Sequence, residues 1–351
     1  MSKPIAIDLF CGAGGLTYGM RKAGIEVVAG IDLDPKMGEV YEANNYPSKF
    51  IKRDIRDITA YDIFELFGDL QGPRILAGCA PCKPFSAINR EGGRKHSDYS
   101  LLNFFSKLIR EVKPDGVIME NVPGITKEGK VIFKRFLDSL KEVGLRSRYE
   151  IIDAADYGVP QHRKRLLLIA SRNTPKLPNV IYGPTTKRPY KTVKDAISSF
   201  PPIESGHKDF GIRNHSCKSL VPTNIARLEM TPKNGGSRDQ IPRDLWIPTH
   251  LRHEGHSDTY GRMSWDEPSP TLTCRCISIS NGRFAHPEQN RGISIREAAK
   301  LQTFPGRYRF PHNFTEAQKA IGNAVPPLLA VKFSNALLRS IPKRSQPSET
   351  D

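Results

Sequence analysis

The chain has 351 residues, a length that favours two structural parts, or one large domain with an insertion, over a single ordinary domain. Its composition, 38% hydrophobic and 26% charged, is typical of a globular chain, and no apolar stretch approaches the roughly 18 residues of a membrane span. Lys plus Arg number 53 against 37 Asp plus Glu, a net charge of +16. This excess indicates a polyanionic partner, with nucleic acid first, although a solvated basic face is an alternative.

The cysteines and the N-terminus indicate a reducing compartment. The six cysteines are Cys11, Cys79, Cys82, Cys217, Cys274 and Cys276. They are too sparse for a disulfide scaffold, and the first ten residues lack the apolar stretch of a secretory signal. We therefore expect a cytoplasmic protein, associated with the nucleoid through DNA. Only Cys79 and Cys82 have the spacing of a redox or metal motif, and a zinc ribbon would need a second such pair.

In chain order, short β-rich runs alternate with helical patterns. Strands are predicted at 4–10, 25–33, 74–80, 115–122 and 166–170. Helices are predicted at 16–24 and at 101–114, where the apolar spacing ends at Pro114. Strand, helix and strand at this rhythm predict parallel βαβ units.

A change of composition after Arg172, toward Pro, Gly, Asn, Lys and Arg, predicts a domain boundary. We expect one domain over 1–172 and 318–343, whose C-terminal amphipathic helix docks back onto it. The region 173–317 is predicted to form a second, smaller domain. Residues 344–351 have the composition of a frayed tail.

A glycine-rich loop follows the first predicted strand and opens a helix. In DLFCGAGGLTYGM, Gly12, Gly14 and Gly15 would let a ligand approach the backbone. The pattern is not GxGxxG, and it suits a cofactor without a pyrophosphate, such as S-adenosylmethionine. Asp32 is at the end of the next predicted strand. Its carboxylate can accept hydrogen bonds from both ribose hydroxyls of the cofactor, or the residue can serve only to form a turn. Asp54 follows the third candidate strand. Its carboxylate either accepts a hydrogen bond from the adenine amino group or caps the N-terminus of a helix.

Cys82 lies in GCAPCKPFS, on a loop that follows a predicted strand. The ammonium of Lys83 beside it would lower the pKa of the thiol and raise its thiolate fraction. Two other interpretations stay open: a buried free cysteine, and a Cys79–Cys82 dithiol used for disulfide exchange.

Six motifs occur in a fixed order. They are DLFCGAGG, the PC dipeptide followed by FS, ENV at 120–122, QHRKR at 161–165, REAAKLQTFP at 296–305 and GNAVP at 322–326. In this order the sequence resembles the DNA (cytosine-5) methyltransferases of the prokaryotic restriction-modification type from end to end. The resemblance implies an α/β fold: a Rossmann-like S-adenosylmethionine-dependent methyltransferase domain with a mixed, mostly parallel sheet, plus a smaller irregular target-recognition domain.

The resemblance also implies catalytic roles. Cytosine carbon 5 is a poor nucleophile, and addition of a thiolate at carbon 6 would activate the ring; Cys82 matches that nucleophile. Glu120 matches the acid that shares a proton with ring nitrogen 3, and its alternative is a strand-end acid in an ion pair. Arg163 matches the residue that holds the 2-oxo oxygen, and Arg165 its structural or phosphate-facing companion. Both arginines could instead form surface ion pairs.

By the same matching, a larger set of residues would bind the cofactor. They are Phe10, Gly12, Gly14, Gly15, Leu16, Asp32, Asp54, Leu101, Asn323 and Val325. Phe10 would stack on the adenine, and Asn323 with Val325 would close the site from the C-terminal side. Leu101 is explained equally well by core packing.

Chemistry at carbons 5 and 6 requires access above the ring plane, so the cytosine must leave the helical stack. The region between Arg165 and Arg296 is long enough to read base edges in the major groove. Candidate DNA contacts are Lys83, Ser86, Arg238, Arg262, Thr271, Arg275 and Arg283. No metal is expected, although His250, His253 and His256 with Cys274 and Cys276 leave a zinc site as a weaker alternative.

The sequence departs from the family pattern at a few positions. Ala80 precedes the PC dipeptide, Lys83 replaces the usual glutamine, Arg53 precedes Asp54, and Asp32 stands where glutamate is more frequent. None removes a reacting group. The expected partner is double-stranded DNA, acted on by a monomer with a separate cognate endonuclease. The alternatives are a tRNA cytosine-5 methyltransferase, a catalytically silent DNA-binding protein and a thiol oxidoreductase.

Overall fold

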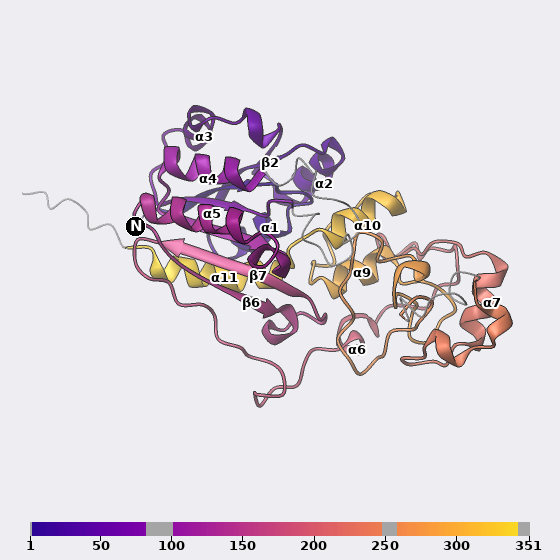
Figure 1. Ribbon diagram of the computed structural model, residues 1–351. Coiled ribbons are helices and arrows are strands. Elements are labelled where there is room, and N and C mark those ends of the chain that lie inside the picture. The colour runs from indigo at the N-terminus through magenta and orange to yellow at the C-terminus, as the bar shows by residue number, and fades with distance from the viewer. Residues whose placement is uncertain (1, 82–100, 248–257, 343–351) are drawn as a thin grey trace, which may run out of the picture. The chain divides into compact units, whose positions relative to one another are not determined.

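The computed structural model describes residues 2–81, 101–247 and 258–342 (Figure 1). Contacts divide the chain into two compact units. Unit 1 comprises Met1–Ile152, Lys164–Asn179 and Leu329–Asp351, and unit 2 comprises Asp153–Arg163 and Val180–Leu328. We describe each unit by itself, and the domain boundaries expected from the sequence stay a prediction.

Unit 1 is built on a seven-stranded sheet with the order β3-β2-β1-β4-β5-β7-β6. The strands are β1 (Ile5–Leu9), β2 (Glu26–Asp32), β3 (Lys49–Lys52), β4 (Arg74–Gly78), β5 (Gly116–Asn121), β6 (Arg146–Asp153) and β7 (Lys164–Ser171). β3, β2, β1, β4 and β5 are mutually parallel, and β7 pairs with β5 in the antiparallel direction. The predicted mixed, mostly parallel α/β sheet is therefore confirmed.

The helices of unit 1 follow its strands along the chain, and the last of them is at its C-terminal end. They are α1 (Gly15–Lys22), α2 (Pro35–Asn45), α3 (Ala60–Phe67), α4 (Leu101–Val112), α5 (Lys130–Glu142) and α11 (Pro327–Ser340). Capping residues in the sequence determine where several of these helices begin. The Asp34 side chain accepts from the Lys36 N–H, with Pro35 at the first helical position, and Thr59 forms a reciprocal capping box with Asp62.

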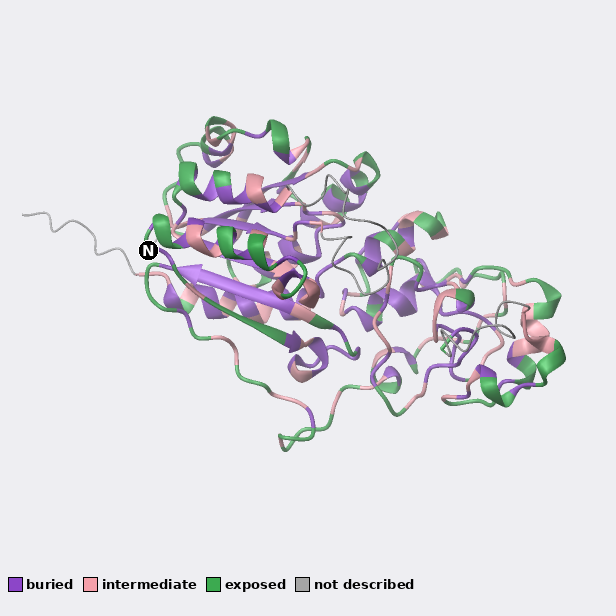
Figure 2. Ribbon diagram, viewed as in Figure 1, coloured by how far each residue is buried: buried purple, intermediate pink, exposed green. Residues whose placement is uncertain are grey.

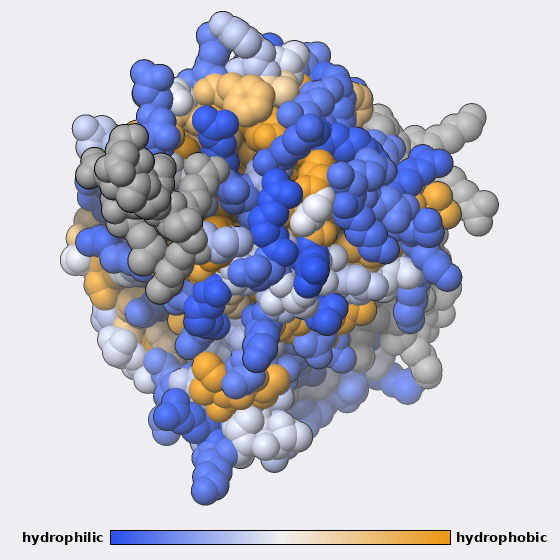
Figure 3. All heavy atoms as spheres, turned by 90° about the vertical axis from the view of Figure 1, so that its left-hand side faces the viewer, coloured by the Kyte–Doolittle hydropathy of each residue, from blue (hydrophilic) through white to orange (hydrophobic). Residues whose placement is uncertain are grey.

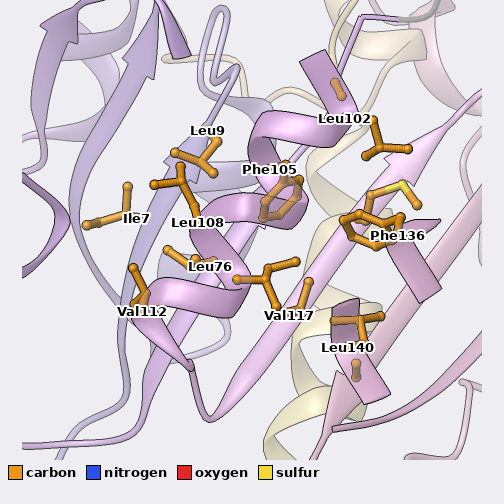
Figure 4. Packing of buried hydrophobic residues seen from close by; sticks show 14 of the residues in the cluster. Ile7, Leu9, Leu76, Leu102, Phe105, Leu108, Val112, Val117, Phe136 and Leu140 are labelled. Carbon is orange, nitrogen blue, oxygen red and sulfur yellow. The ribbon is translucent and has the colours of Figure 1, made fainter. Parts of the chain in front are cut away.

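The main hydrophobic core of unit 1 lies between the sheet and the helices α3, α4 and α5. Figure 4 shows side chains of α4 and α5 directed at the strands. Phe105 of α4, which is fully buried, meets Phe136 of α5 edge-on with ring centroids 5.3 Å apart. The central strands β1, β4, β5 and β7 and the inner faces of these helices are largely buried, whereas β6 and the outer helix faces are largely exposed (Figure 2). This packing holds the carboxyl ends of β1, β4 and β5 in place.

Helix α11 also belongs to unit 1, apart from its first two residues. A Cβ at Gly116 of β5 would come within 3.2 Å of Leu337, so the helix lies close against the sheet at that point. The Ser171 hydroxyl, at the end of β7, lies 2.8 Å from that of Ser340. The C-terminal helix thus packs on strands that precede it by more than 150 residues in the sequence.

Unit 2 is assembled from short helices, 3-10 turns and isolated bridges. Its helices are α6 (Val193–Ile197), α7 (Pro222–Met230), α9 (Ile295–Leu301) and α10 (Phe314–Gly322). At its centre Arg291 donates two hydrogen bonds to Glu297, at 2.7 and 2.8 Å, with both side chains almost fully buried. Burial alone would raise the pKa of Glu297, but these hydrogen bonds hold it below its usual value. An ion pair therefore replaces part of the apolar core.

A few large hydrophobic side chains are exposed at the surface. The face in Figure 3 is mostly hydrophilic. Exposed large side chains such as Tyr46, Tyr61 and Phe210 occur singly along the chain, which is normal for a folded protein. Within the described residues, no helix combines the length and apolarity needed to cross a bilayer.

Candidate active site

Three motifs meet at one edge of the sheet in unit 1. The parallel register places Leu9 of β1 beside Gly78 of β4, and Gly78 beside Met119 of β5. Each of these residues is followed directly by a candidate site segment. The Cys79 N–H continues the ladder by donating to the Leu9 carbonyl at 3.3 Å. The glycine loop, the strand that leads to Cys82, and Glu120 therefore emerge side by side at the carboxyl ends of the strands, where ligands bind in open α/β sheets.

The glycine loop turns sharply between β1 and α1. Phe10, Gly12 and Gly14 all have positive φ, at 58°, 50° and 84°. A Cβ at Gly14 would lie 2.3 Å from the Asn45 amide nitrogen and 2.9 Å from the Tyr41 ring, so only glycine fits there. At Gly12 a Cβ would meet no described atom within 4 Å. The loop is thus packed on one side and has room on the other for a ligand to approach its backbone.

Asp32 is held in place by backbone N–H groups. Its Oδ2 accepts from Gly12 at 2.9 Å, and its Oδ1 accepts from Asp34 at 2.9 Å. Each carboxylate oxygen keeps lone-pair capacity for a further donor, such as a ribose hydroxyl. The shorter side chain, compared with glutamate, ties the end of β2 to the glycine loop.

Asp54 adopts the capping role that the sequence left open. It precedes a 3-10 turn, accepts from the Arg56 N–H and forms two hydrogen bonds with the Arg56 guanidinium, at 2.9 and 2.5 Å. Because of the hydrogen bond with Arg56, the pKa of Asp54 is lowered. The structure accounts for the aspartate without a ligand, and a contact with adenine stays a proposal.

Glu120 forms an ion pair with Arg165. The Arg165 Nε lies 3.2 Å from Glu120 Oε1, and the two side chains are only 15% and 12% exposed. They come from neighbouring antiparallel strands, since Glu120 of β5 pairs with Leu167 of β7. The carboxyl group and the guanidinium thus lie side by side, and both are largely shielded from water. Such a pair can bind a group that has adjacent hydrogen-bond donor and acceptor atoms.

Asn121 connects this pair to the segment that leads to Cys82. Its Nδ2 donates to the carbonyl of Ala80 at 3.3 Å, and its Oδ1 accepts from the Val122 N–H. Ala80, two residues before Cys82 in the sequence, therefore lies beside the end of β5, which carries Glu120. Cys82, Lys83 and Ser86 themselves lie outside the described residues.

Arg163 is buried among backbone carbonyls of its own unit. The residue belongs to unit 2, is 1% exposed, and donates through its Nη atoms to the carbonyls of Leu272, Gly322 and Ala324. The guanidinium is thus surrounded by backbone and joins three segments of unit 2. Within the described residues, Arg165 is thus the arginine that pairs with Glu120, and which of the two arginines contacts the base stays a proposal.

Comparison with known proteins decides the family. The sequence matches the family described as C-5 cytosine-specific DNA methylase over residues 5–339. The chain belongs to this family. It is similar to the Type II methylase M.HgiDII of Herpetosiphon aurantiacus, with 39% identity over 340 residues covering 95% of this chain and 94% of that protein. It is also 29% identical to the Type II methyltransferase M1.HphI of Haemophilus parahaemolyticus, over 95% of this chain and 86% of the relative.

Solved structures agree in fold. A prophage-encoded E. coli chain described as a DNA modification methyltransferase superposes with a TM-score of 0.75 at 21% identity, over 96% of this chain and 99% of that one. The S. pombe Dnmt2 methyltransferase gives 0.63 at 16% identity, over 96% and 98%. The protein is a DNA (cytosine-5) methyltransferase that uses S-adenosylmethionine, and the expected fold class, activity and cofactor are confirmed.

The remaining cofactor candidates divide between the units. Gly15 and Leu16 are buried in the first turn of α1, and Phe10 is partly exposed at the end of β1. Leu101, the first residue of α4, packs against the hydrophobic core of unit 1, in agreement with the alternative that it serves core packing. Asn323 and Val325 lie in unit 2, the first exposed and the second buried. Their roles stay proposals.

The candidate DNA-reading arginines of unit 2 are mostly engaged within the protein. Arg262 is 1% exposed and donates to the carbonyls of Thr231, Leu228, His286 and Gln289. These hydrogen bonds satisfy the guanidinium within the protein, and a contact of Arg262 with DNA stays a proposal. Arg238 is also buried, stacked over Trp246.

Arg283, Thr271 and Arg275 differ in how much of each remains accessible. The Arg283 side chain pairs with Asp258 and donates to three carbonyls of unit 2, and the Thr271 hydroxyl donates to the His162 carbonyl at 2.7 Å. Arg275 is exposed, with one hydrogen bond to Asn281 at 3.2 Å. Among the four candidate arginines, Arg275 is therefore the best placed to meet a phosphate or a base.

One of the two cysteines of the zinc alternative, Cys276, is buried. Burial raises the pKa of Cys276 to about 12, which disfavours the thiolate that binds metals. Over residues 2–81, 101–247 and 258–342, no three His, Cys, Asp or Glu side chains cluster as metal ligands. His250, His253 and His256 lie outside these ranges.

One buried acidic residue near the glycine loop carries a signal in the sequence that we did not use. Asp8, in the middle of DLF, is 1% exposed and contacts Thr17 of α1 rather than solvent. Its position on a strand with an otherwise fully apolar pattern, IAIDL, was the available signal, because a buried acid needs a partner.

Proposed function

We propose that the enzyme methylates carbon 5 of a specific cytosine in double-stranded DNA, after flipping the base from the helix and forming a covalent bond from Cys82 to carbon 6. The Glu120–Arg165 pair, at the strand end that Asn121 joins to Ala80, is the observation that carries the proposal. It supplies a polar surface for a pyrimidine edge close to where the chain enters the PC dipeptide.

The chemistry assigns a task to each group. Attack of the Cys82 thiolate on carbon 6 places negative charge on the ring, toward nitrogen 3 and the 2-oxo oxygen. When the base takes the place of their mutual ion pair, Glu120 shares a proton with nitrogen 3 and Arg165 donates to the 2-oxo oxygen. S-adenosylmethionine supplies the electrophilic methyl group. A base must then remove the proton from carbon 5, after which the thiolate leaves and the ring regains its aromaticity.

The cofactor fits the residues present at the glycine loop. The backbone around Gly12 has room for a ligand, and Asp32 presents fixed carboxylate oxygens at the end of β2, as ribose binding requires. We propose that these two elements hold the nucleoside, with Phe10 against the adenine. Asn323 and Val325 complete the site in this proposal.

DNA as substrate agrees with the charge of the chain. A net charge of +16 favours binding to phosphates, which offsets the few kcal/mol that unstacking and unpairing one base costs. Arg275 and Thr271 are proposed to approach DNA from unit 2, together with Lys83 and Ser86. The Type II relatives support a restriction-modification setting. We propose in addition that the enzyme acts as a monomer in the cytoplasm, beside a separate nuclease.

A direct test uses S-adenosylmethionine with a labelled methyl group, presented with plasmid DNA or with transfer RNA. Label in DNA alone, recovered as 5-methylcytosine after digestion, supports the proposal, and bisulfite sequencing of the plasmid gives the sequence context. Label in transfer RNA alone would replace the DNA substrate by the RNA alternative. A Cys79→Ala variant that keeps full methylation would exclude the dithiol mechanism.

A further inference from the structure

The acid that the sequence analysis overlooked lies at the base of the cofactor loop. Asp8 is on β1, two residues before the loop begins at Phe10, and Thr17 is on the first turn of α1, after the loop ends. Asp8 Oδ2 accepts from the Thr17 N–H at 3.1 Å and from the Thr17 hydroxyl at 2.6 Å. This pair closes the base of the loop, and it satisfies a helix N-terminal N–H that has no acceptor within the helix.

The contact continues as a buried chain of hydroxyl groups. Thr17 Oγ1 lies 3.0 Å from the Tyr41 hydroxyl, which lies 2.7 Å from the Ser48 hydroxyl. All four side chains are at most 3% exposed. The Tyr41 ring packs so closely that a Cβ at Gly14 would come within 2.9 Å of it. The chain therefore connects the charge state of Asp8 to the backbone of the loop.

One oxygen of Asp8 remains without a partner. Asp8 Oδ1 is fully buried, and within the described ranges no group lies at hydrogen-bonding distance from it. A buried carboxylate with one unsatisfied oxygen is costly in its charged form, whereas the protonated form carries no net charge. Burial accordingly raises the pKa of Asp8 from 3.8 to about 7, against the opposing effect of the two hydrogen bonds from Thr17.

Among Asp8 and the described residues that act on it, Asp8 itself is the group whose charge can change near neutral pH. Burial raises the pKa of Cys11 and of Tyr41 well above their usual values, so both stay protonated. Asp32, across the loop, adds a negative charge that further disfavours ionisation of Asp8. A positive charge placed on the loop would act in the opposite direction.

We propose that Asp8 is a charge-sensing positioning residue of the cofactor site, which releases its proton to solvent when the sulfonium of S-adenosylmethionine binds and retains it when the uncharged thioether of S-adenosylhomocysteine binds. Asp8 would act through Thr17 and the loop and would touch neither reacting atom. The balance is simple: one carboxyl O–H breaks, the proton enters water, and the carboxylate compensates the methyl donor's charge. The enzyme would thereby bind substrate more tightly than product above neutral pH.

The inference rests on the proposal that the glycine loop holds the cofactor, and calorimetry can test the two separately. Titration of each cofactor in buffers of different ionisation enthalpy counts the protons released. Since Asp8 is about half protonated at pH 7, S-adenosylmethionine should release about half a proton more than S-adenosylhomocysteine. The affinity ratio of the two should fall by up to about tenfold per pH unit as the pH drops below 7.

Two variants isolate the carboxyl group. Asp8→Asn keeps an acceptor for Thr17 but cannot titrate, so the difference in proton release between the two cofactors should shrink to what the cofactors' own groups contribute. Thr17→Val removes a hydroxyl donor that favours the charged form of Asp8. The pH at which the ratio of S-adenosylmethionine to S-adenosylhomocysteine affinity changes should therefore be higher in this variant. Asp69→Asn, an exposed acid of unit 1, is the matched control and should behave like the wild type.

The outcomes separate the two proposals. Equal proton release by both cofactors in the wild type, or an unchanged difference in Asp8→Asn, overturns the role of Asp8 while leaving the cofactor site intact. Binding of S-adenosylmethionine that a Gly14→Ala change does not weaken would instead overturn the placement of the cofactor on the loop. Should Asp8→Asn fail to fold, the wild-type titrations and Thr17→Val still decide.

Discussion

Replacing Arg165 by alanine separates the two arginines of QHRKR by function. The change removes the guanidinium whose Nε lies 3.2 Å from Glu120. At an effective dielectric constant of about 20, two unit charges at this distance attract by about 5 kcal/mol, an upper bound that partial solvation reduces. A charge-assisted hydrogen bond contributes about 1.5–3 kcal/mol net, so we expect the methyl-transfer step to slow roughly 10- to 100-fold.

The assay is single-turnover methylation with saturating cofactor and DNA, alongside separate measurements of DNA affinity and melting temperature. Arg165→Lys should give an intermediate rate, because it keeps the charge but not the planar guanidinium. Arg163→Ala is the contrasting variant, since it leaves three buried carbonyl acceptors of unit 2 without their donor. It should destabilise unit 2 by about 3–5 kcal/mol and lower its melting temperature.

Two results would refute this reasoning. One is a methyl-transfer rate for Arg165→Ala within twofold of the wild type. The other is an Arg163→Ala protein that has a normal melting temperature but transfers no methyl group, because that result would indicate that Arg163, and not Arg165, contacts the base.

Further substitutions test the acid, the loop and the interior of unit 2. Glu120→Gln should slow single-turnover methylation about 100-fold or more with DNA affinity nearly unchanged, and an equal rate would remove its role as proton donor. Gly14→Ala, whose Cβ would meet α2 at 2.3 Å, should weaken cofactor binding at least tenfold by calorimetry. Gly24→Ala is its control, since φ is also positive but the space is open, and equal losses would contradict the clash. Glu297→Gln should cost about 3–5 kcal/mol in denaturant unfolding by leaving a buried arginine unpaired, and an unchanged midpoint would show the pair to be dispensable.

The sequence was most informative where local pattern and packing agree. Alternating β-rich runs and helical spacing predicted β1, α1, β2, β4, α4, β5 and β7, because buried parallel strands and amphipathic helices have strong local signatures. Asp32 could be placed beside the glycine loop for the same reason, since both follow predicted strands of one parallel sheet.

Contacts between distant segments were harder to predict. Arg163 and Arg165 are two residues apart on an extended chain that passes from unit 2 into unit 1, and which side each faces depends on carbonyls more than 100 residues away. Arg262 looked like a DNA contact because basic residues in a basic region usually face solvent, yet its guanidinium is satisfied by carbonyls that only the fold brings together. Asp8 was overlooked because its partner, Thr17, is on the far side of the loop.

The covalent intermediate is tested most directly by trapping it. Duplex DNA in which 5-fluorocytosine replaces the target cytosine is incubated with enzyme and S-adenosylmethionine and then denatured, since the fluorine at carbon 5 blocks the release of the thiolate. The proposed mechanism predicts a denaturation-resistant protein–DNA complex with the wild type and none with Cys82→Ala, although that variant still binds DNA. Methylation of ordinary DNA without any trapped complex, or an equal complex with Cys82→Ala, would contradict it.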